Sequence, residues 1–269
     1  MNVFRLEIKN TWKSTLKWAI TLSSITFMLL SFFPAMQTES MKELAGAKME
    51  GLDPSLLEAL GLAELTDFTV ITNFFGYVLQ YITLAIMVLV TQLAVNSLIK
   101  EETDGTIEFL YSKSISRGEI LLQKTLANIF SFLSILIVLC IITVIGYLSF
   151  NDYNFVESIK ETSILYGSIL YIGLVFMAIG VLLSAWLKRS KGSSGIVIAI
   201  VFSTFILGIM GLVIDDLSFL SYLSPMDWIK TQKLMTEGIR KEEWLVGILA
   251  IVICYIVAHE IYKRKDLRS

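Results

Sequence analysis

Six long apolar runs without a charged residue divide the chain, and polar segments separate them. The runs cover residues 18–36, 68–99, 125–150, 162–187, 192–214 and 244–258. About 20 helical residues cross the hydrocarbon layer of a bilayer and leave no backbone group unpaired there. The last run is the shortest and needs its flank through Tyr262 to reach across. The pattern predicts an all-α integral membrane protein with six transmembrane helices, formed as one domain over residues 1–269.

Composition supports a membrane protein and restricts its chemistry. Hydrophobic residues make up 55% of the 269 positions and charged residues 17%, against about one half and one quarter in soluble domains. The runs contain no Asp, Glu, Lys, Arg or His, so they offer no proton relay, ion ligand or catalyst. We therefore expect no catalytic residue and no metal site, which argues against a secondary ion carrier and an intramembrane enzyme. Cys140 and Cys254 lie within runs, where we expect them to pack as small apolar groups.

Basic residues are distributed unequally between alternate connecting segments. The set that includes both ends of the chain carries 15 Lys and Arg residues, and the other set carries 7. Basic residues favour the cytoplasmic side of a membrane. We therefore expect a multi-pass protein of the cell membrane, in a bacterium, with both termini cytoplasmic. The loops 37–67, 151–161 and 215–243 would be external.

The segment before the first run, residues 1–17, is amphipathic. Its apolar residues recur every four positions, and its basic residues form a neighbouring row about 100° around a helix. The apolar set is Phe4, Ile8, Trp12 and Leu16, and the basic set is Arg5, Lys9, Lys13 and Lys17. Such a helix can lie in the membrane interface with its basic groups among anionic headgroups. The alternative is that the segment is the solvated start of the first transmembrane helix.

The acidic external loop 37–67 contains one helix signal. Asp53 followed by Pro54 is typical of an N-cap and a first helical position. The short helix that follows would present leucines, which we expect to pack on neighbouring spans.

The last external loop, 215–243, contains a second signal. Ser224 is a predicted N-cap, with an acidic residue three positions later. The apolar residues before it are too few to span a bilayer. They favour a short re-entrant or external helical segment before the sixth span, held at the outer surface by Tyr222 and Trp228.

The cytoplasmic loop 100–124, between the second and third spans, has the most specific pattern. After Gly105, the apolar residues Ile107, Leu110 and Tyr111 share one face of a helix. Carboxylates just before that helix suit the positive end of its dipole. A short amphipathic helix held off the membrane is suited to docking in a groove of another protein.

This loop resembles that of permease subunits of the type-2 exporter class of ATP-binding cassette (ABC) transporters. In that family a Glu, a Gly-Thr pair, a short leucine-rich helix, a Ser-Arg pair and a Lys lead into the third span. Those places are occupied here by Glu102, Gly105, Thr106, residues 108–110, Ser116, Arg117 and Lys124. The six spans, the N-terminal amphipathic segment, the broken segment before the last span and the basic tail also match. One departure is that the family's Pro before the Ser-Arg pair is absent, so the coupling helix could run longer.

The resemblance implies a transport subunit that works with other chains. The sequence contains no Gly-x-x-x-x-Gly-Lys-Ser/Thr phosphate loop, so we expect no cofactor in this chain and no ATPase site of its own. ATP and Mg would be bound by an ABC ATPase subunit, present in two copies. A second permease chain, identical or related, would complete the twelve spans, within a lipid bilayer and without nucleic acid. The alternative function is a non-transporting membrane sensor or assembly factor.

The resemblance also implies which residues act. The residues predicted to couple to the ATPase are Glu102, Gly105, Thr106, Ile107, Leu110, Tyr111 and Arg117. The residues expected to line an export pathway are uncharged polar groups, Gln80, Gln92, Asn96 and Asn128. Such a lining suits an amphiphilic or apolar cargo, although peptide, lipid, drug, polysaccharide and ion cargoes all stay open. His259, beside Glu260, could act as a pH switch, but a capping or interfacial role is commoner.

Overall fold

The computed structural model describes residues 3–39, 70–103, 115–150, 154–187 and 192–265 of the chain. Six helices in these ranges are long and apolar enough to cross a membrane, which confirms the predicted all-α, six-span architecture. They are α1 (Val3–Leu30), α5 (Ile71–Thr103), α7 (Arg117–Phe150), α8 (Phe155–Trp186), α9 (Ser193–Val213) and α11 (Lys241–Arg264).

The first helix differs from the prediction of a separate N-terminal interfacial helix. Helix α1 is continuous over 28 residues, which is about 42 Å at 1.5 Å per residue and exceeds the roughly 30 Å hydrocarbon layer. Residues 3–17 therefore continue into the first span without a break, and their placement at the membrane interface stays a prediction. The chain breaks only after Leu30, and the short helix α2 (Phe33–Met36) follows with Pro34 near its start.

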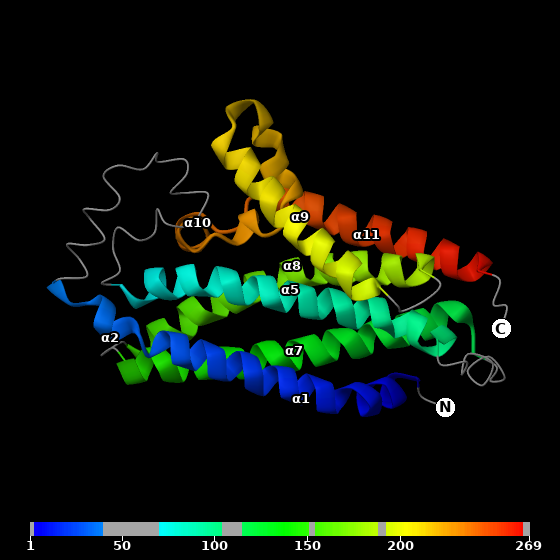
Figure 1. Ribbon diagram of the computed structural model, residues 1–269, viewed down its shortest axis with the longest axis horizontal. Coiled ribbons are helices and arrows are strands. Elements are labelled where there is room, and N and C mark those ends of the chain that lie inside the picture. Colours follow the sequence, from blue (N-terminus) through cyan, green and yellow to red (C-terminus); the bar gives the residue numbers. More distant parts are fainter. Residues whose placement is uncertain (1–2, 40–69, 104–114, 151–153, 188–191, 266–269) are drawn as a thin grey trace.

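The helices form a bundle in which neighbours in space are not always neighbours in sequence. Helix α1 lies along α7, and both α5 and α11 lie along α8 (Figure 1). Both ends of the chain lie at the same end of the bundle, together with the end of α5, the start of α7 and the end of α8 (Figure 1). We call this the basic end, because the segments rich in Lys and Arg adjoin it. The prediction that these segments share one side of the membrane agrees with this arrangement.

Helix α8 forms the centre of the bundle through close backbone approach. A Cβ atom at Gly180 would lie 2.7 Å from both the Thr91 carbonyl oxygen and the Ala94 Cβ of α5, and one at Gly173 would meet the Phe132 ring of α7. Small residues allow such packing, which drives helix association in lipid. These glycines serve packing within the chain, whereas α7 turns large apolar side chains such as Ile141 outward.

A broken helical segment precedes the last span, as predicted. It consists of two 3-10 helices, η2 (Asp215–Leu223) and η3 (Asp227–Ile229), and α10 (Thr231–Thr236). Two details of the prediction are wrong. Ser224 does not cap a helix, because η3 begins at Asp227 without a side-chain cap. Trp228 is 2% exposed and its ring lies 6.1 Å from that of Tyr171, so it packs in the core rather than at the membrane surface.

We call residues 215–236 the outer segment, and a buried charge fixes it to α11. Glu243 is 2% exposed, and its carboxylate lies 2.8 Å from the Arg240 guanidinium and 3.5 Å from the Lys233 ammonium group. The same carboxylate accepts a hydrogen bond from the Arg240 backbone N–H, which caps the start of α11. The Tyr171 hydroxyl of α8 donates to the carbonyls of Glu243 and Trp244.

We predict that Gly180→Leu disrupts the α5–α8 contact, because the new side chain would overlap backbone as well as side-chain atoms. Overpacking of this kind costs about 1–3 kcal/mol. Gly167→Leu is the matched control, because a Cβ at Gly167 on the same helix meets nothing within 4 Å. Thermal unfolding in detergent, followed by size exclusion, should show a lower midpoint for Gly180→Leu alone. Equal midpoints would contradict the packing assigned to α8.

Candidate coupling site at the basic end

The structure places the two limbs of the predicted coupling loop side by side. Glu102 belongs to the last turn of α5, and Arg117 is the first residue of α7. The other predicted coupling residues, Gly105, Thr106, Ile107, Leu110 and Tyr111, lie in 104–114, outside the described residues. The described part of the site consists of the helix ends on either side of the loop.

Arg117 connects the start of α7 to the end of α11. Its Nη1 group donates to the carbonyls of Tyr262, Lys263 and Lys265, at 3.1, 3.0 and 2.9 Å. The last carbonyls of a helix have no partner within the helix, and a cation there also meets the negative end of the helix dipole. Next to it, the Lys265 ammonium group donates to the Leu187 carbonyl at the end of α8, at 2.8 Å. The guanidinium group of Arg117 is thus bound to the bundle itself.

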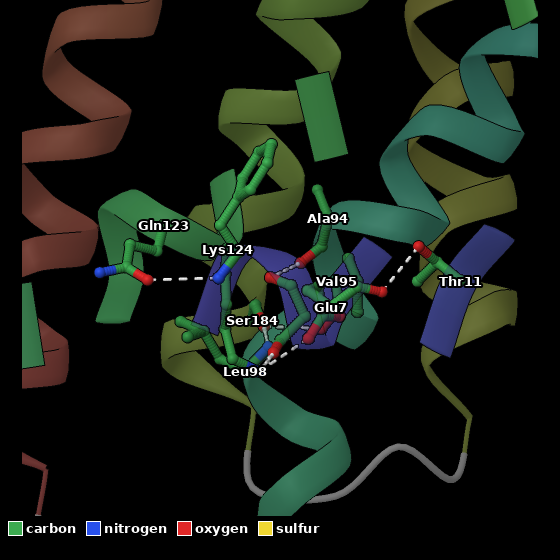
Figure 2. Close-up of polar contacts among 10 residues, drawn as sticks. Glu7, Thr11, Ala94, Val95, Leu98, Gln123, Lys124 and Ser184 are labelled. Atoms are coloured by element: carbon green, nitrogen blue, oxygen red, sulfur yellow. Dashed lines mark hydrogen bonds and ion pairs between the residues drawn. The ribbon is translucent and has the colours of Figure 1, made fainter. Parts of the chain in front are cut away.

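Lys124 connects three helices two turns further along α7 (Figure 2). Its side chain is 1% exposed, lies 3.6 Å from the Glu7 carboxylate of α1, and donates to the Ser97 carbonyl of α5. Glu7 is itself 6% exposed. A buried ammonium group is tolerated only where a counter-charge and hydrogen-bond acceptors surround it. Ser97 lies before residues 104–114 and Lys124 lies after them, so this one side chain joins the helices on both sides of that segment to α1.

Ser184 adds the contact between α5 and α8. Its hydroxyl donates to the Val95 carbonyl at 2.6 Å and accepts the Leu98 backbone N–H at 3.0 Å (Figure 2). Hydrogen bonds between helices lend specificity to packing in membranes. We use the name clasp for the residues whose side chains or carbonyl make these connections, namely Glu7, Ser97, Arg117, Lys124, Ser184 and Lys265. The clasp joins α1, α5, α7, α8 and α11 around the ends of the predicted coupling loop.

Sequence patterns identified part of the clasp. Arg117 and Lys124 belong to the motif that resembles the exporter family, whereas the roles of Glu7 and Ser184 were missed. A signal for Glu7 was present, because it is the first carboxylate of the chain and lies between Arg5 and Lys9 in the sequence. Ser184 gave none, since a serine in an apolar run is most often a packing residue. His259 packs beside Gly118 at the start of α7.

The four predicted pathway residues do not form one surface in a single chain. Gln92 and Asn96 share the outward face of α5, where the Gln92 amide donates to Asn96 at 2.9 Å and to the Ser193 hydroxyl at 3.4 Å. Asn128 is 1% exposed inside the bundle, and its Nδ2 has no hydrogen-bond partner among the described residues. Gln80 lies near the other end of the bundle, beside a small cavity.

That cavity, of about 50 Å³, lies between α5, α8, α9 and the outer segment. It has room for a few water molecules. Thr83 and Ser224 line it, and within the described part of the chain their buried hydroxyls have no hydrogen-bond partner. Asp227, paired with Lys230 at 3.0 Å, lies at the same cavity.

The fold and the clasp define a class of protein: a multi-pass helical membrane subunit with a polar junction around one loop. Within the described ranges, no group of three or more His, Cys, Asp and Glu side chains could hold a metal ion. A family model described as ABC-2 family transporter protein matches residues 1–267. The chain belongs to this family, and it is a membrane permease of an ABC transporter. Such permeases are transmembrane subunits that associate with a separate ABC ATPase subunit. Among curated proteins, none matches the chain.

We predict that Arg117→Gln frees the end of α11, because a charged group that binds three carbonyls is lost. Hydrogen bonds to charged groups contribute about 1.5–3 kcal/mol. Backbone amides near the end of α11 should exchange faster with deuterium, by about tenfold or more. Arg264→Gln is the control, since Arg264 is 83% exposed and pairs only loosely with Glu260, at 3.4 Å. If both variants exchange alike, the anchoring role of Arg117 is excluded.

Proposed function

We propose that this permease exports its cargo from the cell, driven by ATP that two copies of the ATPase hydrolyse at the basic end. The observation that carries the proposal is the clasp, because it bonds together the helix ends on both sides of residues 104–114. A force applied to that loop would act on five helices together. The ATP and Mg²⁺ would be bound by the ATPase, and the basic end would face the cytoplasm with both termini.

The coupling step follows from the order of contacts. Nucleotide binding would bring the two ATPases together, and the apolar face of Ile107, Leu110 and Tyr111 would follow the groove in which it is docked. The limbs cannot move independently, because Lys124 bonds the Ser97 carbonyl across the loop. Helices α5 and α7 would therefore move as one body. Arg117 contributes by holding the start of α7 to α11 rather than by reaching the ATPase.

The outward face of α5 supports an assembly of two permease chains. Amide side chains at Gln92 and Asn96 are costly to leave against lipid tails. Tyr81, which is 49% exposed, lies on the same side of α5, and its hydroxyl donates to that of Tyr77 at 3.3 Å. A second chain, identical or related, would cover this face and leave an uncharged polar and aromatic pathway between the two copies. Such a lining suits an amphiphilic or apolar cargo.

We predict that Leu110→Asp abolishes ATPase binding without affecting membrane insertion. Burying an unpaired carboxylate in the docking groove costs several kcal/mol, which weakens a complex by orders of magnitude. Ser112→Asp is the matched control, because it adds the same charge to the same loop but away from the apolar face. Copurification of the ATPase should be lost, and efflux with it, for Leu110→Asp alone. A Leu110→Asp chain with its ATPase and full export would show that the loop is only a connector.

The orientation has its own prediction. In a background without Cys140 and Cys254, a cysteine at Lys113 should be protected from an impermeant maleimide in intact cells, and one at Lys160 should react. Opening the cells should expose position 113. Reaction of position 113 in intact cells would reverse the proposed topology.

A further inference from the structure

Helix α1 has two opposite polar faces near the basic end. Residues two positions apart on a helix are about 200° apart around its axis. The side that packs against the bundle carries Glu7, Thr11 and Thr15. The two threonine hydroxyls donate to the backbone carbonyls of Glu7 and Thr11, one turn earlier. Lys9, Lys13 and Lys17 each follow one of these residues by two positions, and all three are exposed. We call these three lysines the lysine face.

The lysine face has the composition of a surface that contacts lipid headgroups. Trp12 and Leu16, which alternate with the lysines along the sequence, are 49% and 50% exposed. The apolar run begins at Trp18, so the charged half of α1 lies where the helix leaves the hydrocarbon layer. Lysine stems and a tryptophan at that depth match the boundary between headgroups and acyl chains. Three cations in a row select an anionic membrane surface over a neutral one.

The other face of α1 carries the clasp. Glu7 holds the Lys124 ammonium group, the Phe4 backbone N–H donates to the Gln123 side chain at 3.2 Å, and Val3 packs against Ile120. All of these partners lie in the first turns of α7, directly after the coupling loop. A change in the position of this half of α1 therefore changes the surroundings of Lys124, and with it the bond to α5.

We propose that anionic lipid headgroups bind the lysine face and thereby regulate coupling between the ATPase and the permease. This inference rests on the proposed function, because it concerns the same loop. Anionic headgroups hold the start of α1 at the membrane surface and keep Glu7 beside Lys124. In a neutral membrane this restraint is lost, and the population in which the clasp is complete falls. Anionic lipid therefore raises the rate of ATP hydrolysis by the complex.

The test compares the complete complex in nanodiscs of phosphatidylcholine and in nanodiscs that also contain about 30% phosphatidylglycerol, a source of surface negative potential. The readout is the ratio of the two ATPase rates. We expect a ratio of about three or more for the unaltered complex, since each lysine near an anionic surface contributes about fivefold to binding. A combined Lys9→Gln, Lys13→Gln and Lys17→Gln chain should bring the ratio to about one. Lys160→Gln with Lys241→Gln, exposed lysines at the other end of the bundle, should leave the ratio high.

A second variant separates lipid contact from its transmission. Glu7→Gln combined with Lys124→Met removes both charges, so that neither is left buried without a partner. Phosphatidylglycerol retained by the isolated permease, counted by mass spectrometry, should match that of the unaltered chain. The ATPase ratio should nevertheless fall to about one.

Each result has one meaning. A ratio of one for the unaltered complex overturns the lipid regulation but leaves the proposed function intact, provided that the permease still binds its ATPase. Loss of the ATPase from the lysine-face variant in detergent would show that these lysines contact protein instead of lipid. A ratio that stays high in the Glu7→Gln, Lys124→Met chain would overturn the transmission through the clasp. Absence of any complex with an ATPase would instead refute the proposed function.

Discussion

A lysine ammonium group that is 1% exposed at the edge of a membrane sets the arrangement of three helices. Its desolvation is unfavourable by several kcal/mol unless counter-charge and acceptors are in place. Glu7 supplies the charge and the Ser97 carbonyl supplies an acceptor. Helices α1, α5 and α7 must therefore meet at this point, or the charge is left without compensation. Replacing one partner alone would be far more damaging than replacing both.

The same requirement explains why the basic end is bonded mainly from side chain to backbone. Helix ends leave carbonyls without partners, and in a bundle these ends gather at one level. Arg117 and Lys265 satisfy the ends of α11 and α8. Each bond both satisfies an acceptor and fixes one helix against another. Helices that share so many such bonds move together, as the proposed drive through one loop would require.

The sequence predicted the spans well because their signal is local. A bilayer demands about 20 apolar residues per helix, so the six runs could be found without knowledge of any contact. The continuity of α1 could not be found, because an amphipathic start looks the same whether it turns into the interface or continues as one helix. The pairing of Glu7 with Lys124 depends on which helices are neighbours, and the two residues are 117 positions apart in the sequence. Trp228 was misplaced for the same reason, since an aromatic residue near a membrane surface suits both the interface and the core.

The outer segment is attached unequally to its neighbours. Toward α11 it is fixed by the ion pair of Lys233 with Glu243, and toward α8 by the contact of the Trp228 ring with that of Tyr171. Toward α5 and α9 it borders the cavity lined by Thr83 and Ser224, whose hydroxyls bond to nothing among the described residues. Beyond the cavity the segment packs closely on α9, because a Cβ atom at Gly211 would lie 2.6 Å from the Ser221 backbone nitrogen. The segment therefore links α9 to α11, and these helices cannot separate at this end of the bundle unless the segment itself deforms beside the cavity, where water can take the place of the missing partners.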